Sequence, residues 1–259
     1  CLGVSDKFET IKDAIDGNLY DSGHHGLDVK KKIVEPDGLS FGLRIRDNFD
    51  LKDGLDAVEA VAQGEVSNAY ALCRPPGHHA EADQGRGFCL LGNIPVAVML
   101  ARALGQVNRV AILDWDVHHG NGQQAAFYDE PDVLTLSIHQ AANYPLETGS
   151  FDEQGEGAGL GANLNLPLPP GCGLGAYAYA MEKLVLPALE AFKPELIVVA
   201  CGYDACAKDP LGKMLLNSKA FATMTAQLKA LAERCCGGKL VFIHEGGYSE
   251  GYVPLCGHA

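Results

Sequence analysis

Short apolar runs recur along the chain from about residue 68 onward. They are nearly continuous in Val, Ile, Leu and Ala, and polar or glycine residues bound each of them. Runs of this kind are typical of strands that are buried on both faces of a parallel sheet. The pattern therefore predicts five strands, at residues 69–73, 110–114, 133–138, 196–201 and 240–244.

Helical stretches lie between these runs. Apolar residues at three- and four-residue spacing predict helices over 175–192 and 218–235, and Pro187 is expected to kink or split the first of them. A further helix is predicted over 95–104, with Asn93 as its cap. Alternating strands and helices indicate an α/β fold, a three-layer αβα domain with a central parallel sheet.

Two segments lack such a pattern. Residues 155–170 are rich in Gly, Pro and Asn and are expected to form a long surface loop. In residues 1–50 only a turn or two of helix is indicated, over 8–15. The pair His24-His25 has neither a strand before it nor acidic neighbours at metal-ligand spacing, so we assign no chemistry to it.

Composition narrows the range of functions. The chain has 259 residues, enough for one domain with a sizeable core, and a formal net charge of -13, which argues against direct binding of nucleic acid. It has no apolar run long enough to span a membrane and no visible secretory signal. Nine cysteines without zinc-finger spacing indicate a reduced protein, so we expect a cytoplasmic location. The chain begins with Cys1 rather than Met, and the sequence leaves its true N-terminus and its oligomeric state open.

Polar residues cluster where four of the predicted strands end. The clusters are RPPGHH at 74–79, DWDVHHGNG at 114–122, GYD at 202–204 and EGGY at 245–248. In open α/β sheets, ligands bind beyond the carboxyl ends of the strands. Four clusters at the same edge therefore predict one shared site.

The second cluster has the spacing of a metal site. Asp114, Asp116 and His118 alternate along an extended chain, so their side chains point to one side. Two carboxylates and an imidazole in a dry site require a cation, and this donor set suits zinc or iron. Asp204 is the best candidate for a third ligand. The alternative is that the carboxylates cap the following helix.

Other clusters supply groups for proton transfer. The tandem His78-His79 follows a turn that is rigid because of its Pro and Gly residues, and histidine changes charge near neutral pH. Tyr248 is placed to donate a hydrogen bond to a developing oxyanion. Together with a metal, these groups indicate metal-assisted hydrolysis. The sequence contains neither a phosphate-binding glycine motif after a strand nor the nucleophile elbow of serine hydrolases.

These motifs, with GFC at 87–89, resemble the histone deacetylase family, particularly its class II-like and bacterial amidohydrolase branch. The resemblance runs from about residue 68 to 248. It implies an arginase/deacetylase-like fold, with residues 1–259 forming a single catalytic domain whose first 50 residues match poorly. It also implies a zinc-dependent deacetylase that removes an acetyl or other short acyl group from an acylated lysine or a related amine. The chain ends soon after Tyr248, where the family continues into another helix.

The resemblance further implies roles for individual residues. The zinc ligands would be Asp116, His118 and Asp204, with Fe²⁺ as an alternative metal in the cell. His79 would act as general base and acid and His78 as its electrostatic partner. Asp114 would orient His78, Asn121 would orient His79, and Tyr248 would polarise the amide carbonyl. Asn at 121 is similar to the class II branch.

A tunnel for the acyl-lysine is implied as well. Gly87, Phe88 and Tyr144 match its walls. Leu211 stands where related polyamine deacetylases carry an acid, and an apolar residue there favours acyl-lysine or a non-cationic amide. A structural K⁺ or Na⁺ is expected at the carbonyl groups of Asp114, Asp116 and His118, with Ser137 and Ile138.

Three alternatives remain at this point. An arginase-like hydrolase with two manganese ions would need a second cluster of Asp ligands, which the sequence lacks. An acyl-lysine binding module with weak activity would have lost the catalytic Tyr or His, and both are present. A deacetylase of acetylpolyamines or other small amides differs only in its substrate.

Overall fold

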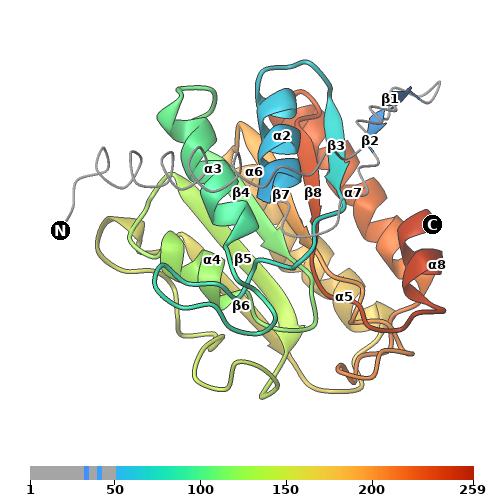
Figure 1. Cartoon of the computed structure of the whole chain (residues 1–259). Helices are drawn as coiled ribbons and strands as arrows, with labels where there is room; N and C mark the ends of the chain where they lie inside the picture. Colours follow the sequence, from blue (N-terminus) through green and yellow to red (C-terminus); the bar gives the residue numbers. More distant parts are fainter. Residues whose placement is uncertain (1–31, 35–39, 43–50) are drawn as a thin grey trace, which may run out of the picture.

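A computed structural model describes residues 32–34, 40–42 and 51–259 of the chain. Its centre is a six-stranded parallel sheet with the order β3-β8-β7-β4-β5-β6 (Figure 1). The strands are β3 (Asn68–Ala71), β4 (Val110–Asp114), β5 (Val133–Gln140), β6 (Asn163–Leu168), β7 (Leu196–Cys201) and β8 (Leu240–His244). A short antiparallel pair, β1 (Lys32–Val34) with β2 (Ser40–Gly42), lies outside this sheet.

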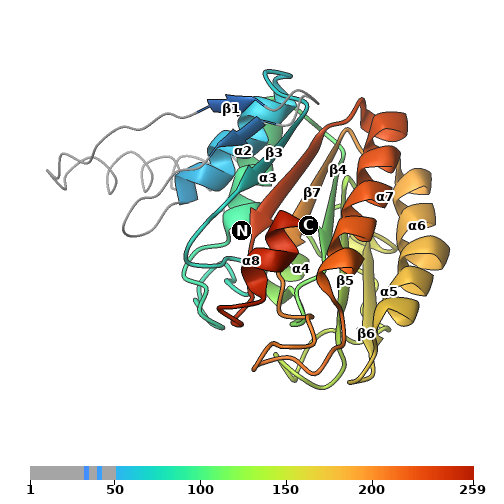
Figure 2. The same ribbon diagram turned by 90° about the vertical axis from the view of Figure 1, so that its right-hand side faces the viewer.

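Helices cover both faces of the sheet, as Figure 2 shows. One layer contains α2 (Leu51–Ala62) and α3 (Asn93–Ala103), and the opposite layer contains α5 (Leu174–Ala180), α6 (Leu186–Phe192) and α7 (Ser218–Cys236). Alternate strand residues enter two separate cores, with Ile112 on the α2–α3 side and Leu113 on the other. Burial on both faces explains the continuous apolar runs, and the predicted three-layer αβα architecture is confirmed.

The predicted strands agree closely with the structure. The strands at 110–114, 196–201 and 240–244 have the expected bounds. The first strand is β3, shifted toward the N-terminus, and β5 extends two residues beyond 138.

The prediction of a surface loop over 155–170 is wrong. This segment contains a short 3₁₀ helix, Gly157–Gly159, and then the edge strand β6, which pairs with β5. The Asn and Pro residues that suggested a loop are compatible with a strand at this position. Asn163 and Asn165 are buried and donate to Gln124 Oε1 over 2.9 and 2.8 Å. Pro167 is tolerated because an edge strand has one unpaired side.

The helix predicted over 175–192 is divided, as Pro187 suggested. A π-helical segment, Met181–Val185, separates α5 from α6, and the proline lies in the first turn of α6. Proline cannot donate to the preceding turn, so the helix widens there. The helix α7 has almost the predicted bounds, with Asn217 as its cap.

The predicted cap of α3 is wrong. Asn93 is the first helical residue and Gly92 precedes it as the cap. The Asn93 side chain instead donates to the carbonyl oxygen of Pro75 over 3.1 Å and so supports the 74–79 turn.

Within the described residues, three α-helices had no predicted counterpart: α2, α4 (Asn121–Ala126) and α8 (Val253–His258). The helix expected over 8–15 and the pair His24-His25 lie outside the described residues. Among the helices that the structure describes, none combines the length and apolar character needed to cross a membrane.

Candidate metal centre and active site

The loops that follow four neighbouring strands meet at the carboxyl edge of the sheet. The amide of Gly77, after β3, donates to Glu245 Oε2, after β8, over 2.7 Å. The amide of Val117, after β4, donates to Asp204 Oδ1, after β7, also over 2.7 Å. The segments expected to share a site are therefore joined by direct hydrogen bonds.

Asp116, His118 and Asp204 form a buried group at this edge. His118 Nδ1 lies 3.0 Å from Asp116 Oδ1 and 3.1 Å from Asp204 Oδ2. One potential ligand atom from each residue lies within 4.8 Å of the other two. Because β4 and β7 are paired in the sheet, Asp204 reaches the two residues that follow β4.

The electrostatics of this group fit a cation. Burial works against ionisation of both carboxyls, and Asp116 helps to raise the pKa of Asp204 to about 8. Burial opposes a charge on His118 as well, yet the two carboxylates raise its pKa to about 10. Positive charge is thus strongly favoured between them. One imidazole and two carboxylates form a donor set that suits zinc.

Close packing around the carboxylates explains Gly246, the first glycine of the EGGY motif. The amide of Gly246 donates to Asp116 Oδ2 over 2.8 Å. A Cβ on Gly246 would lie 2.3 Å from Asp204 Oδ2 and 2.5 Å from Asp116 Oδ2. Only glycine lets the backbone come this close.

Asp114 lies next to His78, and its Oδ1 accepts a hydrogen bond from the amide of Asp116 over 2.9 Å. His78 Nδ1 lies 2.9 Å from Asp114 Oδ2, which also accepts a hydrogen bond from Gln123 Nε2 over 2.7 Å. Burial by itself would lower the pKa of His78, but Asp116 and Asp114 raise it well above its usual value. The carboxylate of Asp114 therefore favours a charged His78.

His79 makes the equivalent contact with a neutral partner. Its Nδ1 lies 2.8 Å from Asn121 Oδ1, and Asn121 Nδ2 donates to the backbone carbonyl of His79 over 3.1 Å. Burial, with a contribution from His78, lowers the pKa of His79 to about 2. The structure thus pairs one imidazole that favours the charged form with one that favours the neutral form, and their ring centroids are 3.9 Å apart.

Aromatic side chains surround the approach to these histidines. The Tyr144 ring meets His79 edge-on at 4.9 Å, and the Phe88 ring lies 5.8 Å from that of Tyr248. Phe88 is 68% exposed, which is inconsistent with core packing and consistent with a wall of an open channel. Gly87 has a φ of +57°, and a Cβ there would lie 2.2 Å from His79 Cδ2.

Asp209 holds both Tyr248 and Leu211 by their backbones. Tyr248 N donates to Asp209 Oδ2 over 2.7 Å, and Leu211 N donates to Asp209 Oδ1 over 2.9 Å. Burial and the negative charges of Asp116 and Asp204 raise the pKa of the Tyr248 hydroxyl, which therefore remains a proton donor. Asp209 received no predicted role, and its one signal in the sequence is its position five residues after Asp204.

Of the residues expected at a monovalent-cation site, Asp114 ends β4, and Ser137 and Ile138 lie within β5. Asp114 and Ser137 are register partners, and both they and Ile138 are buried. Ser137 Oγ lies 2.9 Å from His139 Nδ1.

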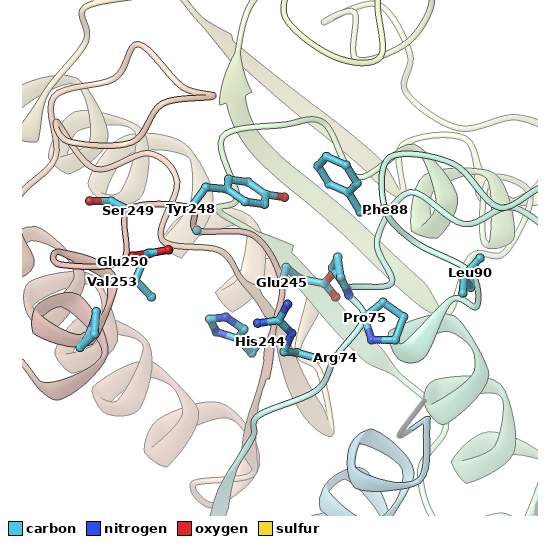
Figure 3. Close-up of a pocket in the computed structure, with 13 residues that line it drawn as sticks. Arg74, Pro75, Phe88, Leu90, His244, Glu245, Tyr248, Ser249, Glu250 and Val253 are labelled. Atoms are coloured by element: carbon cyan, nitrogen blue, oxygen red, sulfur yellow. The ribbon is translucent and has the colours of Figure 1, made fainter. Parts of the chain in front are cut away.

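Glu245 is a further buried group that received no predicted role. Its Oε2 accepts hydrogen bonds from the amides of Gly77 and His78, which anchors the loop that carries both histidines. Burial raises the pKa of this carboxyl to about 7. Figure 3 shows Glu245 with Arg74 and His244 in a cavity of about 960 Å³ that Phe88 and Tyr248 also line.

Comparison with known proteins agrees with this geometry. The family described as histone deacetylase domain matches residues 51–258. The histone deacetylase-like amidohydrolase of Pseudomonas aeruginosa is 49% identical over 254 residues, which cover 98% of this chain and 63% of that protein. A probable deacetylase of Archaeoglobus fulgidus is 43% identical over 199 residues, covering 76% of this chain and 55% of that protein.

A solved structure is similar as well. The crystal structure of the HDA15 HD domain matches with a TM-score of 0.75 and 39% identity, covering 79% of this chain and 58% of that one. This chain therefore spans less than two thirds of the length of these relatives. The family match contains all six strands of the parallel sheet and every site residue described above. The chain belongs to the histone deacetylase family.

Proposed function

We propose that this chain is a zinc-dependent amidohydrolase that removes an acetyl or other short acyl group from an acylated lysine. The observation that carries the proposal is the buried group of Asp116, His118 and Asp204 next to the His78–His79 pair, with the His79 and His118 rings 5.9 Å apart. A metal site beside a neutral imidazole is an arrangement that suits metal-assisted hydrolysis of an amide.

The metal and the two histidines would have different roles in the reaction. A zinc ion held by Asp116, His118 and Asp204 would lower the pKa of water and polarise the acyl carbonyl. His79 Nε2 accepts the proton from the attacking water, because its Nδ1 is bonded to Asn121. The same nitrogen then delivers a proton to the leaving amine. His78, held charged by Asp114, stabilises the negative charge that develops.

Tyr248 and the aromatic walls complete the proposed site. The Tyr248 hydroxyl donates a hydrogen bond to the oxyanion as the carbonyl carbon becomes tetrahedral. Phe88 and Tyr144, beside Gly87, line the channel that receives the lysine stem. A channel with apolar walls accepts the methylene groups of lysine and excludes water from the reaction.

Two finer assignments belong to this proposal. The amide of Asn121 as the partner of His79 supports a class II-like enzyme. Asp114, Ser137 and Ile138, with the carbonyls of Asp116 and His118, are proposed to hold a structural K⁺ or Na⁺.

Leu211 bears on the choice of amine. It is 44% exposed, and its carbonyl accepts a hydrogen bond from Asn143, the neighbour of Tyr144. An apolar side chain here offers no charge to a distant ammonium group, which favours acyl-lysine over acetylpolyamines.

A substrate panel tests the proposal. Purified protein is assayed on a fluorogenic acetyl-lysine peptide, the trifluoroacetyl-lysine analogue and acetylputrescine, before and after chelation and after restoration of zinc. We expect turnover of the lysine amides that chelation abolishes and zinc restores. Turnover confined to acetylputrescine would overturn the lysine assignment, and chelator-resistant turnover would overturn the metal assignment.

A further inference from the structure

Asn121 can orient His79 only if its amide group faces the right way. The amide oxygen and nitrogen have similar sizes but opposite hydrogen-bonding roles. With the oxygen toward His79, the ring nitrogen Nδ1 must carry the proton, and Nε2 keeps a free lone pair. With the amide reversed, Nδ2 would donate to Nδ1, and the proton would move to Nε2, where it prevents the ring from acting as a base.

The carboxylate of Glu81 lies on the other side of the Asn121 amide, opposite His79. Glu81 Oε1 accepts a hydrogen bond from Asn121 Nδ2 over 2.5 Å, and the His79 carbonyl accepts the other Nδ2 hydrogen over 3.1 Å. A carboxylate cannot donate, so a reversed amide would turn its oxygen toward the negative charge of Glu81. We propose that Glu81 is a positioning residue that sets the amide of Asn121 and, through it, the tautomer of His79. The catalytic part of this inference rests on the proposed function.

The surroundings hold Glu81 in place. Its amide donates to the Gln84 carbonyl over 2.9 Å, which closes a turn just after His79. Arg86 NH1 lies 3.6 Å from Glu81 Oε1. Arg86 also pairs with Glu147 and approaches Tyr144 Oη at 3.4 Å, so the same arginine reaches the wall of the channel.

The solvent exposure of Glu81 limits the loss of activity that we expect when its carboxylate is removed. Asn121 is only 2% exposed, whereas the Glu81 side chain is 29% exposed. Solvent weakens the charge of Glu81, and the His79 carbonyl still accepts one amide hydrogen when Glu81 is removed. A hydrogen bond to a charged group of this kind supports an expected loss of about tenfold.

The test compares Glu81→Ala with Glu81→Gln, and uses Glu147→Ala as the matched control. Glu147→Ala removes the other carboxylate from Arg86 without touching Asn121. We expect Glu81→Ala to lower kcat about tenfold with KM within about twofold and unchanged zinc content. Glu81→Gln keeps an acceptor oxygen and should retain most of the activity, and Glu147→Ala should keep kcat within about twofold.

An Asp at position 121 distinguishes amide orientation from simple loop stability. A carboxylate has no wrong orientation, and in Asn121→Asp it would also lie against the negative charge of Glu81. We therefore expect the double variant Glu81→Ala/Asn121→Asp to be at least as active as Asn121→Asp alone. Wild-type kcat in Glu81→Ala, or an equal loss from Glu81→Ala in both backgrounds, would overturn the inference.

A spectroscopic measurement separates this inference from the proposed function. In protein labelled with ¹⁵N-histidine and stripped of metal, the His79 ring signals report which nitrogen carries the proton. We expect the Nδ1–H tautomer in the wild type and a share of the Nε2–H tautomer in Glu81→Ala. Identical tautomers in both proteins would refute the role of Glu81, whatever the substrate assays give.

Discussion

The backbone amide of Tyr248 is held by the carboxylate of Asp209 at 2.7 Å, although 39 residues separate them in the chain. Asp209 is 8% exposed, and its other oxygen accepts from the amide of Leu211. The hydroxyl proposed to meet the oxyanion therefore depends on a carboxylate in a different loop.

Replacing Asp209 should reduce turnover without removing the metal. Asp209→Ala leaves two partly buried amides without their charged acceptor, so we expect a loss of about 1–3 kcal/mol in folding stability and about tenfold in kcat. Asp209→Asn keeps one acceptor oxygen and should lose less of both. Thermal unfolding, zinc content and kcat are measured on each variant. Full kcat in Asp209→Ala would show that Tyr248 does not need this anchor.

Tyr248→Phe should remove one oxyanion donor and little else. We expect kcat to fall about a hundredfold or more, with zinc content unchanged. Steady-state kinetics on the acetyl-lysine peptide measure this. Unaltered kcat would eliminate Tyr248 from the proposed mechanism.

Gly87→Ala should inactivate the site because a Cβ at 87 overlaps the His79 ring. Gly105 provides a matched control, because it also has a positive φ, +69°, but nothing lies within 4 Å of its Cβ position. Both variants carry the backbone strain, and only Gly87→Ala displaces a side chain of the proposed catalytic group. We expect turnover to be lost in Gly87→Ala and retained in Gly105→Ala; equal activities would contradict this reading.

His244 should contribute to loss of stability in acid. Burial lowers its pKa to about 4, and its Nδ1 lies 3.0 Å from the Tyr70 hydroxyl. An unfolded histidine binds a proton near pH 6.5, so between about pH 6.5 and 4 the unfolded state binds more protons than the folded state. The free energy of unfolding therefore falls as the pH drops through this window, by about 3 kcal/mol from this residue.

Urea unfolding at several pH values between 4 and 7 measures that contribution. His244→Gln should show a shallower dependence on pH than the wild type. His258→Gln, which replaces a histidine at the exposed end of α8, is the matched control for removal of a histidine. An equal slope in the His244→Gln variant and the wild type would contradict the assignment.

Asp204→Asn should separate metal binding from folding. Its amide oxygen can still accept from Val117 N, and the substitution removes one of two buried carboxylates that lie together. We expect the metal-free variant to be at least as stable as the metal-free wild type. Zinc should raise the melting temperature of the wild type only, since a ligand stabilises the state that binds it. A similar rise in Asp204→Asn would remove Asp204 from the ligand set.

Local sequence patterns were sufficient to predict much of the architecture. Strands such as 110–114 and 196–201 were predictable because each is buried on both faces, so every position along them except Asp114 is apolar. The edge strand β6 escaped prediction, because its Asn163 and Asn165 reach buried partners that lie far away in the sequence. Asn93 was mistaken for a cap for the same reason, since its partner is Pro75 on another loop.

The site residues, like the strands and helices, were predictable in part from the sequence. The sequence by itself determined which residue types gather at the carboxyl edge of the sheet, because parallel strands bring the residues that follow them to one side. Only the tertiary structure decided the distances between them: His78 Nδ1 lies 2.9 Å from Asp114 Oδ2, the contact that the resemblance implied, and His118 Nδ1 lies 3.0 Å from Asp116 Oδ1. It also brought in Glu81, Asp209 and Glu245, whose partners are 40, 39 and 168 residues away. Hydrogen bonds between distant loops leave no periodic trace in a sequence, so these contacts become visible only when the chain is folded.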